Sequence, residues 1–207
     1  MRVNQVYLKY KIPHNLQEHM LRVGAVIKII TDQWTGKPVN QKAMIQTGLF
    51  HDLGKPMIFD LKKQSQWMTN KEIDELRQIQ TELRKRYGND EHEVLIGVAT
   101  EIGCQLETLR LLKVFEWENV SQLMKDGDSE ALVPIYADMR IGPMGILPLT
   151  DRFDDLNQRR PETKLIALLK TAEKLEQEIQ AQTKVGLNKI TNLEITDLFE
   201  YLLKLEV

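Results

Sequence analysis

Apolar residues recur at steps of three and four along most of the chain, which is the spacing of one face of an α-helix. The first clear stretch runs from Leu16 to Ile30 and is followed by the helix breakers Gly36 and Pro38. Comparable stretches occupy residues 40–52, 69–88, 90–103, 106–117 and 129–140. No segment shows a clear strand-like alternation of apolar and polar residues. The pattern therefore predicts an all-α fold.

Residues that favour helix N-termini stand before several of these stretches. Asn15 with Glu18, and Thr69 with Glu72, have the spacing of a capping box. Asn40 precedes the stretch at 40–52 and has the side chain of a good N-cap. We therefore expect helices to begin at these three positions.

The last third of the chain has a different character. Residues 141–153 are rich in Gly and Pro and are expected to form a loop, and a polar stretch at 157–161 marks a soft boundary. It separates a body, residues 1–157, from a helical C-terminal extension, residues 158–207. Apolar residues of the extension follow a heptad-like stripe: Leu165, Leu168, Ala172, Leu175 and Ile179. The stripe fits packing of the extension on the body, and a homodimer seam is the alternative.

The composition is that of an ordinary globular protein, with 42% hydrophobic and 28% charged residues and a formal net charge of −2. So small a net charge argues against a broad nucleic-acid-binding surface. Cys104 is the only cysteine, so neither an internal disulfide nor a thiolate metal cluster is expected. The chain has no apolar run of about 20 residues and no apolar leader, which favours a cytoplasmic protein without a membrane span.

A histidine and an aspartate stand side by side at the predicted end of a helix, in the sequence GLFHDLGKP at residues 48–56. The nitrogen of His51 and the oxygens of Asp52 suit a divalent cation of borderline hardness. Further ligands must come from other helices, and His19 in EHMLRVG and Asp138 in YADMRIG are the candidates. Burial of an unpaired carboxylate is costly, and a cation would offset that cost. We therefore expect these four residues to form one metal site.

The order His…His-Asp…Asp, carried by EHMLRV, FHDLGK and YADMR, resembles the HD-domain metal-dependent phosphohydrolases over about residues 15–155. The resemblance implies a helical fold with a metal at its centre and hydrolysis of phosphate esters, often of nucleotides. It maps the family's four ligands onto His19, His51, Asp52 and Asp138. The expected architecture is a multi-helix HD-domain-like bundle with a helical C-terminal extension.

Asp52 of the HD pair and the nearby Lys55 are candidates for catalysis. A cation lowers the pKa of the water that it coordinates, and Asp52 could orient or deprotonate that water. Charge that develops on the phosphoryl group needs cationic support. Lys55 is the preferred candidate, because the turn at Gly54 keeps it near the site. Its alternative role is to compensate the C-terminus of the helix.

Two arginines are further candidates for substrate binding. Arg22 follows His19 by about one helical turn, so both can lie on one face. Arg140 follows Asp138 by two positions and is the weaker candidate.

His92 is expected in the first turn of a helix, where backbone N–H groups favour anions. The resemblance implies that a histidine in this region contacts the phosphate or binds a second metal. Two-metal members of the family carry two further histidines between the HD pair and the last aspartate, whereas this chain has only His92 there. We therefore expect one divalent ion (Mn, Fe, Co, Ni, Zn or Mg). Glu91 or Glu93 could complete a second site.

The sequence supports two functions. The preferred function is a divalent-metal-dependent phosphohydrolase that cleaves a phosphate ester of a small molecule, with nucleotides preferred, by metal-activated water. The alternative is a catalytically weak, metal-containing helical module that binds a nucleotide or a protein partner. The sequence does not distinguish a monoester from a diester substrate, because specificity depends on the shape of the pocket.

Overall fold

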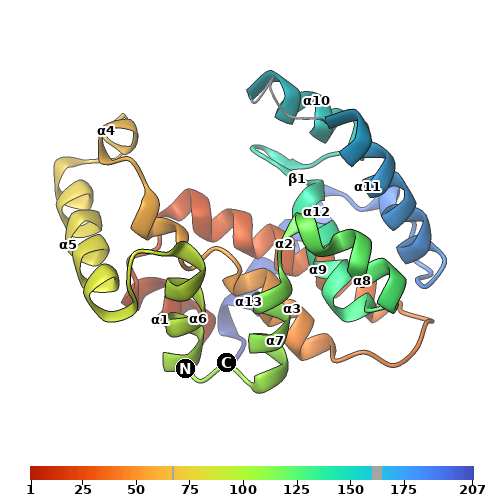
Figure 1. Ribbon diagram of the computed structural model, residues 1–207, viewed down its shortest axis with the longest axis horizontal. Coiled ribbons are helices and arrows are strands. Elements are labelled where there is room, and N and C mark those ends of the chain that lie inside the picture. Colours follow the sequence, from red (N-terminus) through yellow and green to blue (C-terminus); the bar gives the residue numbers. More distant parts are fainter. Residues whose placement is uncertain (67, 160–164) are drawn as a thin grey trace.

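Helices form most of the structure, a computed structural model that describes residues 1–66, 68–159 and 165–207 (Figure 1). The α-helices are α1 (Val3–Lys9), α2 (His14–Asp32), α3 (Gln41–Phe50), α4 (Leu61–Gln64), α5 (Asn70–Tyr87), α6 (Glu91–Glu101), α7 (Leu106–Val114), α8 (Val120–Asp126), α9 (Ser129–Arg140), α10 (Leu149–Arg159), α11 (Leu165–Gln180), α12 (Asn192–Asp197) and α13 (Phe199–Lys204). Short 3-10 helices are η1 (Lys55–Ile58), η2 (Trp117–Asn119) and η3 (Leu187–Lys189), and one small antiparallel sheet pairs β1 (Ile141–Gly142) with β2 (Gly145–Ile146). The predicted all-α fold is confirmed.

Helices α2 and α3 pack along each other at the centre of the molecule, with α9 against both and α7 against α3 (Figure 1). Gly48 of α3 permits this close approach, because a Cβ atom there would lie 3.1 Å from the backbone nitrogen of Gly24 in α2 and would also overlap the Ile27 side chain. Only a glycine fits such a backbone-to-backbone contact without a shift of one helix. The contact draws the C-terminal end of α3 towards α2.

The C-terminal helices pack on the same hydrophobic core as the rest of the chain. In the predicted stripe, Ala172, Leu175 and Ile179 are buried and belong to one apolar cluster with residues of α2, α3 and α9. The side chain of Leu165 lies outside the described part of the structure. Helices α12 and α13 contact α2, and the two termini meet where Val207 donates a backbone hydrogen bond to Met1 at 3.0 Å. In the described ranges no helix is both long and apolar enough to cross a membrane.

Local signals located some helix starts and missed others. Asn40 caps α3 by accepting from the Ala43 backbone, and Thr69 with Glu72 forms the predicted capping box of α5. The predicted box at Asn15 is wrong, because α2 already begins at His14 with Pro13 as its N-cap. The predicted loop at 141–153 is also only partly correct: it contains the β1–β2 hairpin and the start of α10 at Leu149. No helix was expected before residue 15, where α1 lies.

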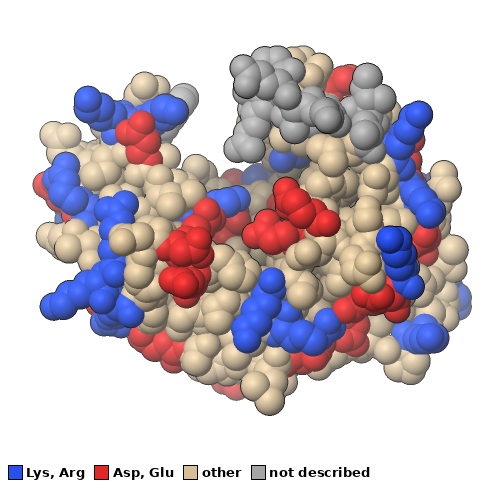
Figure 2. Space-filling view, in the orientation of Figure 1, with Lys and Arg blue, Asp and Glu red and all other residues tan. Residues whose placement is uncertain are grey.

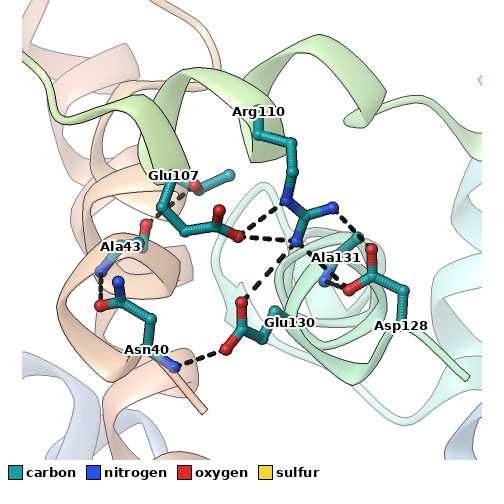
Figure 3. Close-up of polar contacts among 8 residues, drawn as sticks. Asn40, Ala43, Glu107, Arg110, Asp128, Glu130 and Ala131 are labelled. Atoms are coloured by element: carbon teal, nitrogen blue, oxygen red, sulfur yellow. Dashed lines mark hydrogen bonds and ion pairs between the residues drawn. The ribbon is translucent and has the colours of Figure 1, made fainter.

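A polar cluster ties the start of α9 to α7 and to the N-terminal end of α3 (Figure 3). Arg110 of α7 donates to Glu107 at 2.7 Å and to Asp128, the N-cap of α9, at 2.6 Å. The backbone N–H of Asn40 donates to Glu130 at 2.6 Å, and Arg110 lies 3.7 Å from the same carboxylate. These contacts fix one end of α9, and the other end carries Asp138.

Candidate metal centre

The His51–Asp52 pair lies where α3 stops and the chain turns into η1. His51 still has helical backbone angles and donates its backbone N–H to Thr47 at 2.9 Å. The turn then passes so close to the start of α6 that a Cβ atom on Gly54 would clash with the carbonyl oxygen of Glu91. This tight turn places the His51 and Asp52 side chains together and brings the following Lys55 beside them.

One hydrogen bond fixes the tautomer of His51. Its Nδ1 lies 2.9 Å from the carbonyl oxygen of Gly48, which can only accept, so Nδ1 carries the proton and donates. The lone pair of Nε2 is then available to a cation. The side chain is only 2% exposed, and this burial lowers the pKa of His51 despite the opposing effect of the nearby carboxylates. His51 is thus held in the neutral form that binds metals.

Three helices meet at this imidazole. His19 comes from α2 and Asp138 from the last turn of α9. Nε2 of His19 lies 3.2 Å from Nε2 of His51 and 3.0 Å from Oδ1 of Asp138. The third pair, Nε2 of His51 and Oδ1 of Asp138, is 3.7 Å apart. All three donor atoms lie within 4.8 Å of one another, which is close enough for a single ion to contact all three.

Asp52 borders this group of three donors. Its Oδ1 lies 3.5 Å from Nε2 of His51, and its Oδ2 lies 3.6 Å from Nε2 of His19. Oδ2 also accepts a hydrogen bond from Nζ of Lys55 at 2.8 Å. The two oxygens therefore have different surroundings: Oδ1 faces His51, whereas Oδ2 is shared between the lysine and His19.

The carboxylate of Asp138 is held in the ionised form. Burial raises the pKa of Asp138, but the hydrogen bond with His19 and the neighbouring His51 and Lys55 outweigh burial and lower it. For Lys55 burial acts in the other direction and lowers the pKa. The contact with Asp52 outweighs this effect, so the pKa of Lys55 is raised. The centre thus combines the imidazoles of His19 and His51 with the side chains of Asp52 and Asp138. Imidazole nitrogens and carboxylate oxygens together fit a divalent cation of borderline hardness.

A cavity of about 560 Å³ opens beside the centre. His51, Asp52, Lys55 and Asp138 form one side of it, and the start of α6 and the segment 115–118 form much of the rest. His92 lines this cavity, with its Nδ1 4.0 Å from Oε1 of Glu116. Figure 2 shows acidic side chains concentrated near the hollow in the middle of this face. The volume is in the range of small-molecule sites.

The structure does not bring the two arginines to the cavity. Arg22 pairs with Glu18 at 3.1 Å and is not among the described lining residues. Arg140 is buried; it donates to the carbonyl oxygen of Leu147 at 2.6 Å and pairs with Glu176 at 3.2 Å. Residues two apart on a helix point about 200° apart, so Arg140 and Asp138 lie on opposite sides of α9. This geometry gives Arg140 a structural contact in place of the predicted contact with substrate.

Sequence reasoning did not single out the cavity wall formed by Phe115, Glu116, Trp117 and Glu118. The Phe115 ring lies 4.8 Å from the His51 ring, so this wall directly adjoins the centre. The motif VFEWEN carries an unusual alternation of aromatic and acidic residues. Only the packing of α7 against α3, however, shows that it reaches the site.

The fold and the centre together define an all-α protein with a candidate divalent-metal site between three helices. The family model of the HD domain matches residues 16–177, and the chain belongs to this family, whose members are in general hydrolases. The match extends beyond residue 157, the predicted end of the body, into α11. Comparison with curated proteins and with solved structures gives no match.

Proposed function

We propose that this protein is a divalent-metal-dependent phosphohydrolase that cleaves a phosphate ester of a small molecule, with nucleotides as the preferred substrate class. The observation that carries the proposal is the convergence of His19, His51 and Asp138, with Asp52 beside them, at the wall of a small-molecule-sized cavity. Membership of the HD family supports the same reaction class.

The proposed ligands are His19, His51, Asp52 and Asp138. A divalent ion held there would supply a Lewis acid and lower the pKa of a coordinated water. Asp52 is the proposed acceptor of the proton from the attacking water, because one of its oxygens faces the centre and the other is held by Lys55. Four protein ligands leave coordination positions open on a six-coordinate ion, as catalysis requires.

Lys55 and His92 are the proposed contacts to the phosphoryl group. Both line the cavity, and Lys55 is partly exposed while its ammonium group stays within 2.8 Å of Asp52. A fixed positive charge there would stabilise negative charge that develops on the phosphoryl oxygens. His92 lies in the first turn of α6, where backbone N–H groups add to the attraction for an anion. Arg22 and Arg140 are not part of this proposal.

The test is hydrolysis of a panel of nucleotides and general phosphate esters by metal-free protein to which each of Mn, Fe, Co, Ni, Zn and Mg is added in turn. At least one metal is expected to restore hydrolysis, and Asp138→Asn is expected to lose it. Glu200→Gln, the same acid-to-amide change at an exposed site on α13, is expected to keep it. Activity that survives complete chelation contradicts the proposal. A protein that binds metal and nucleotide without any turnover would be the binding module instead.

A further inference from the structure

Most charged side chains that line the cavity are acidic, whereas a phosphate group is itself negative and needs positive charge around it. Beyond His51, Asp52 and Asp138, the wall carries the acidic residues Asp90, Glu91, Glu116 and Glu118. Of the described lining residues only Lys55 is a lysine or arginine, and it already pairs with Asp52. The divalent ion of the proposed function would supply positive charge for the phosphoryl group at His19, His51, Asp52 and Asp138. The remaining carboxylates must therefore face the alcohol part of the ester, not its phosphate.

The same wall offers aromatic and apolar surface. Phe115 and Trp117 alternate with Glu116 and Glu118, and both rings are partly buried. Buried Leu95 adds an aliphatic floor. Aromatic side chains of this kind stack on the faces of nucleobases without regard to sequence. A planar ring on this surface has carboxylate oxygens available at its edges.

The backbone of the segment 115–118 is held in a defined shape by hydrogen bonds. Its backbone is pinned to α7 where Glu116 donates to the Val114 carbonyl at 2.8 Å and Asn119 donates its side-chain N–H to the same carbonyl at 3.1 Å. A 3-10 turn follows, in which Asn119 donates its backbone N–H to Glu116 at 3.1 Å. The side chain of Glu116 also approaches His92, at the start of α6, to 4.0 Å. The acidic and aromatic side chains are therefore presented on one fixed turn.

From these observations we infer that the segment 115–118 is the specificity wall of the site, and that it selects nucleobases bearing an exocyclic amino group. The inference rests on the proposed function and deepens it. Ionised carboxylates only accept hydrogen bonds, so Glu116 and Glu118 pair with the amino group of adenine or cytosine. The oxo group of hypoxanthine or uracil at the same position is itself an acceptor, so these bases offer only the ring N–H beside it as a donor. Phe115 and Trp117 stack on the ring of either kind.

The experiment compares substrates that differ only in this group: AMP with IMP, and CMP with UMP, as 5′-monophosphates and as 3′,5′-cyclic monophosphates. Ribose 5-phosphate and ribose 3,5-cyclic phosphate serve as the corresponding references without a base. The amino member of each pair is expected to have a kcat/KM about tenfold higher, since hydrogen bonds to partly exposed charged groups discriminate only modestly. Trp117→Ala is expected to lower kcat/KM for all nucleotides relative to kcat/KM for the base-free reference.

Glu116→Gln combined with Glu118→Gln tests the carboxylates themselves. Both side chains are exposed, so the variant should fold, and an amide can donate as well as accept. The ratio of kcat/KM for the amino substrate to kcat/KM for the oxo substrate is expected to fall to between one and two. Glu200→Gln, the matched change on α13, is expected to leave the ratio as it is in the unaltered protein.

The outcomes separate this inference from the proposed function. If no ester of the panel is hydrolysed with any metal, the proposed function fails and the inference falls with it. If nucleotides are hydrolysed but AMP equals IMP and CMP equals UMP, the inference alone is overturned. A ratio that the double variant leaves unchanged, or faster cleavage of an aliphatic quaternary-ammonium phosphate such as phosphocholine, also overturns it.

Discussion

His51 illustrates how a single residue is prepared for one role by its own helix. The hydrogen bond to Gly48 comes from the same stretch of chain, and burial keeps the ring neutral, so Nε2 faces the centre as an acceptor. His19 and Asp138 supply the remaining close donors from other helices. The three donor atoms lie close enough together for a single ion to contact all of them.

Replacement of His19 by alanine removes one nitrogen donor from the centre. We expect the affinity for a divalent metal to fall by more than about 100-fold, because even loss of a supporting contact behind a ligand typically costs 10–100-fold. The matched control is His14→Ala, an exposed histidine on the same helix, which should bind metal as the unaltered protein does. Isothermal titration with each metal measures this, and equal affinities for the two variants contradict the assignment.

Close approaches between elements hold the centre together. Helix α3 touches α2 at Gly48, and the turn after α3 touches the start of α6 at Gly54. At the opposite end of the site, Arg140 ties the end of α9 to Leu147 and to Glu176 of α11. Because Asp138 lies two residues before Arg140, the position of this ligand depends on that anchor.

Gly54→Ala tests the contact between the HD turn and α6. A Cβ atom there meets backbone, not a movable side chain, so the variant should lose about 1–3 kcal/mol of unfolding free energy and bind metal more weakly. Gly186→Ala is the control, because its Cβ would meet only the flexible Lys189 side chain, 3.1 Å away. Chemical denaturation of both variants measures the difference. A Gly54 variant as stable as the Gly186 variant would show that the approach is not tight.

Arg140→Met tests the anchor of α9. It leaves the Leu147 carbonyl without its donor and removes the cationic partner of Glu176, and breaking a buried pair from one side costs about 3 kcal/mol. The Glu176 carboxylate still accepts hydrogen bonds from Tyr136 and Asn188. The double variant Arg140→Met with Glu176→Met should recover part of this loss, since no charge is then left unpaired. Urea unfolding gives both values. A single variant within about 0.5 kcal/mol of the unaltered protein would contradict a structural role for Arg140.

At the scale of the whole molecule, the C-terminal helices are part of the core. We expect Leu175→Ala in α11 to lower the free energy of unfolding by about 2–5 kcal/mol, because the side chain is fully buried in the common apolar cluster. Leu193→Ala, at a site that is 70% exposed, should change it by less than about 0.5 kcal/mol. Thermal or chemical unfolding in one transition is expected for both. A separate early transition in the α11 variant would indicate an independent extension.

Much of this architecture could be predicted because its signals are local. The helical period identified the long helices, and the caps at Asn40 and Thr69 depend on contacts within one turn. The direction of Arg140 could have been inferred from its spacing of two from Asp138, which places the pair on opposite sides of α9. The cavity wall at 115–118 could not be inferred from the sequence, because it depends on packing between segments far apart in the chain. The β1–β2 hairpin is too short to leave an alternating pattern.

We propose that one divalent ion binds between α2, the end of α3 and the last turn of α9. The most direct measurement is a crystal structure with Mn²⁺, using anomalous scattering to locate the metal. We predict one peak at coordination distance, about 2.0–2.3 Å, from Nε2 of His19, Nε2 of His51 and a carboxylate oxygen of Asp138, with Asp52 as the fourth ligand. A fully loaded crystal whose only peaks lie away from these side chains would contradict the account.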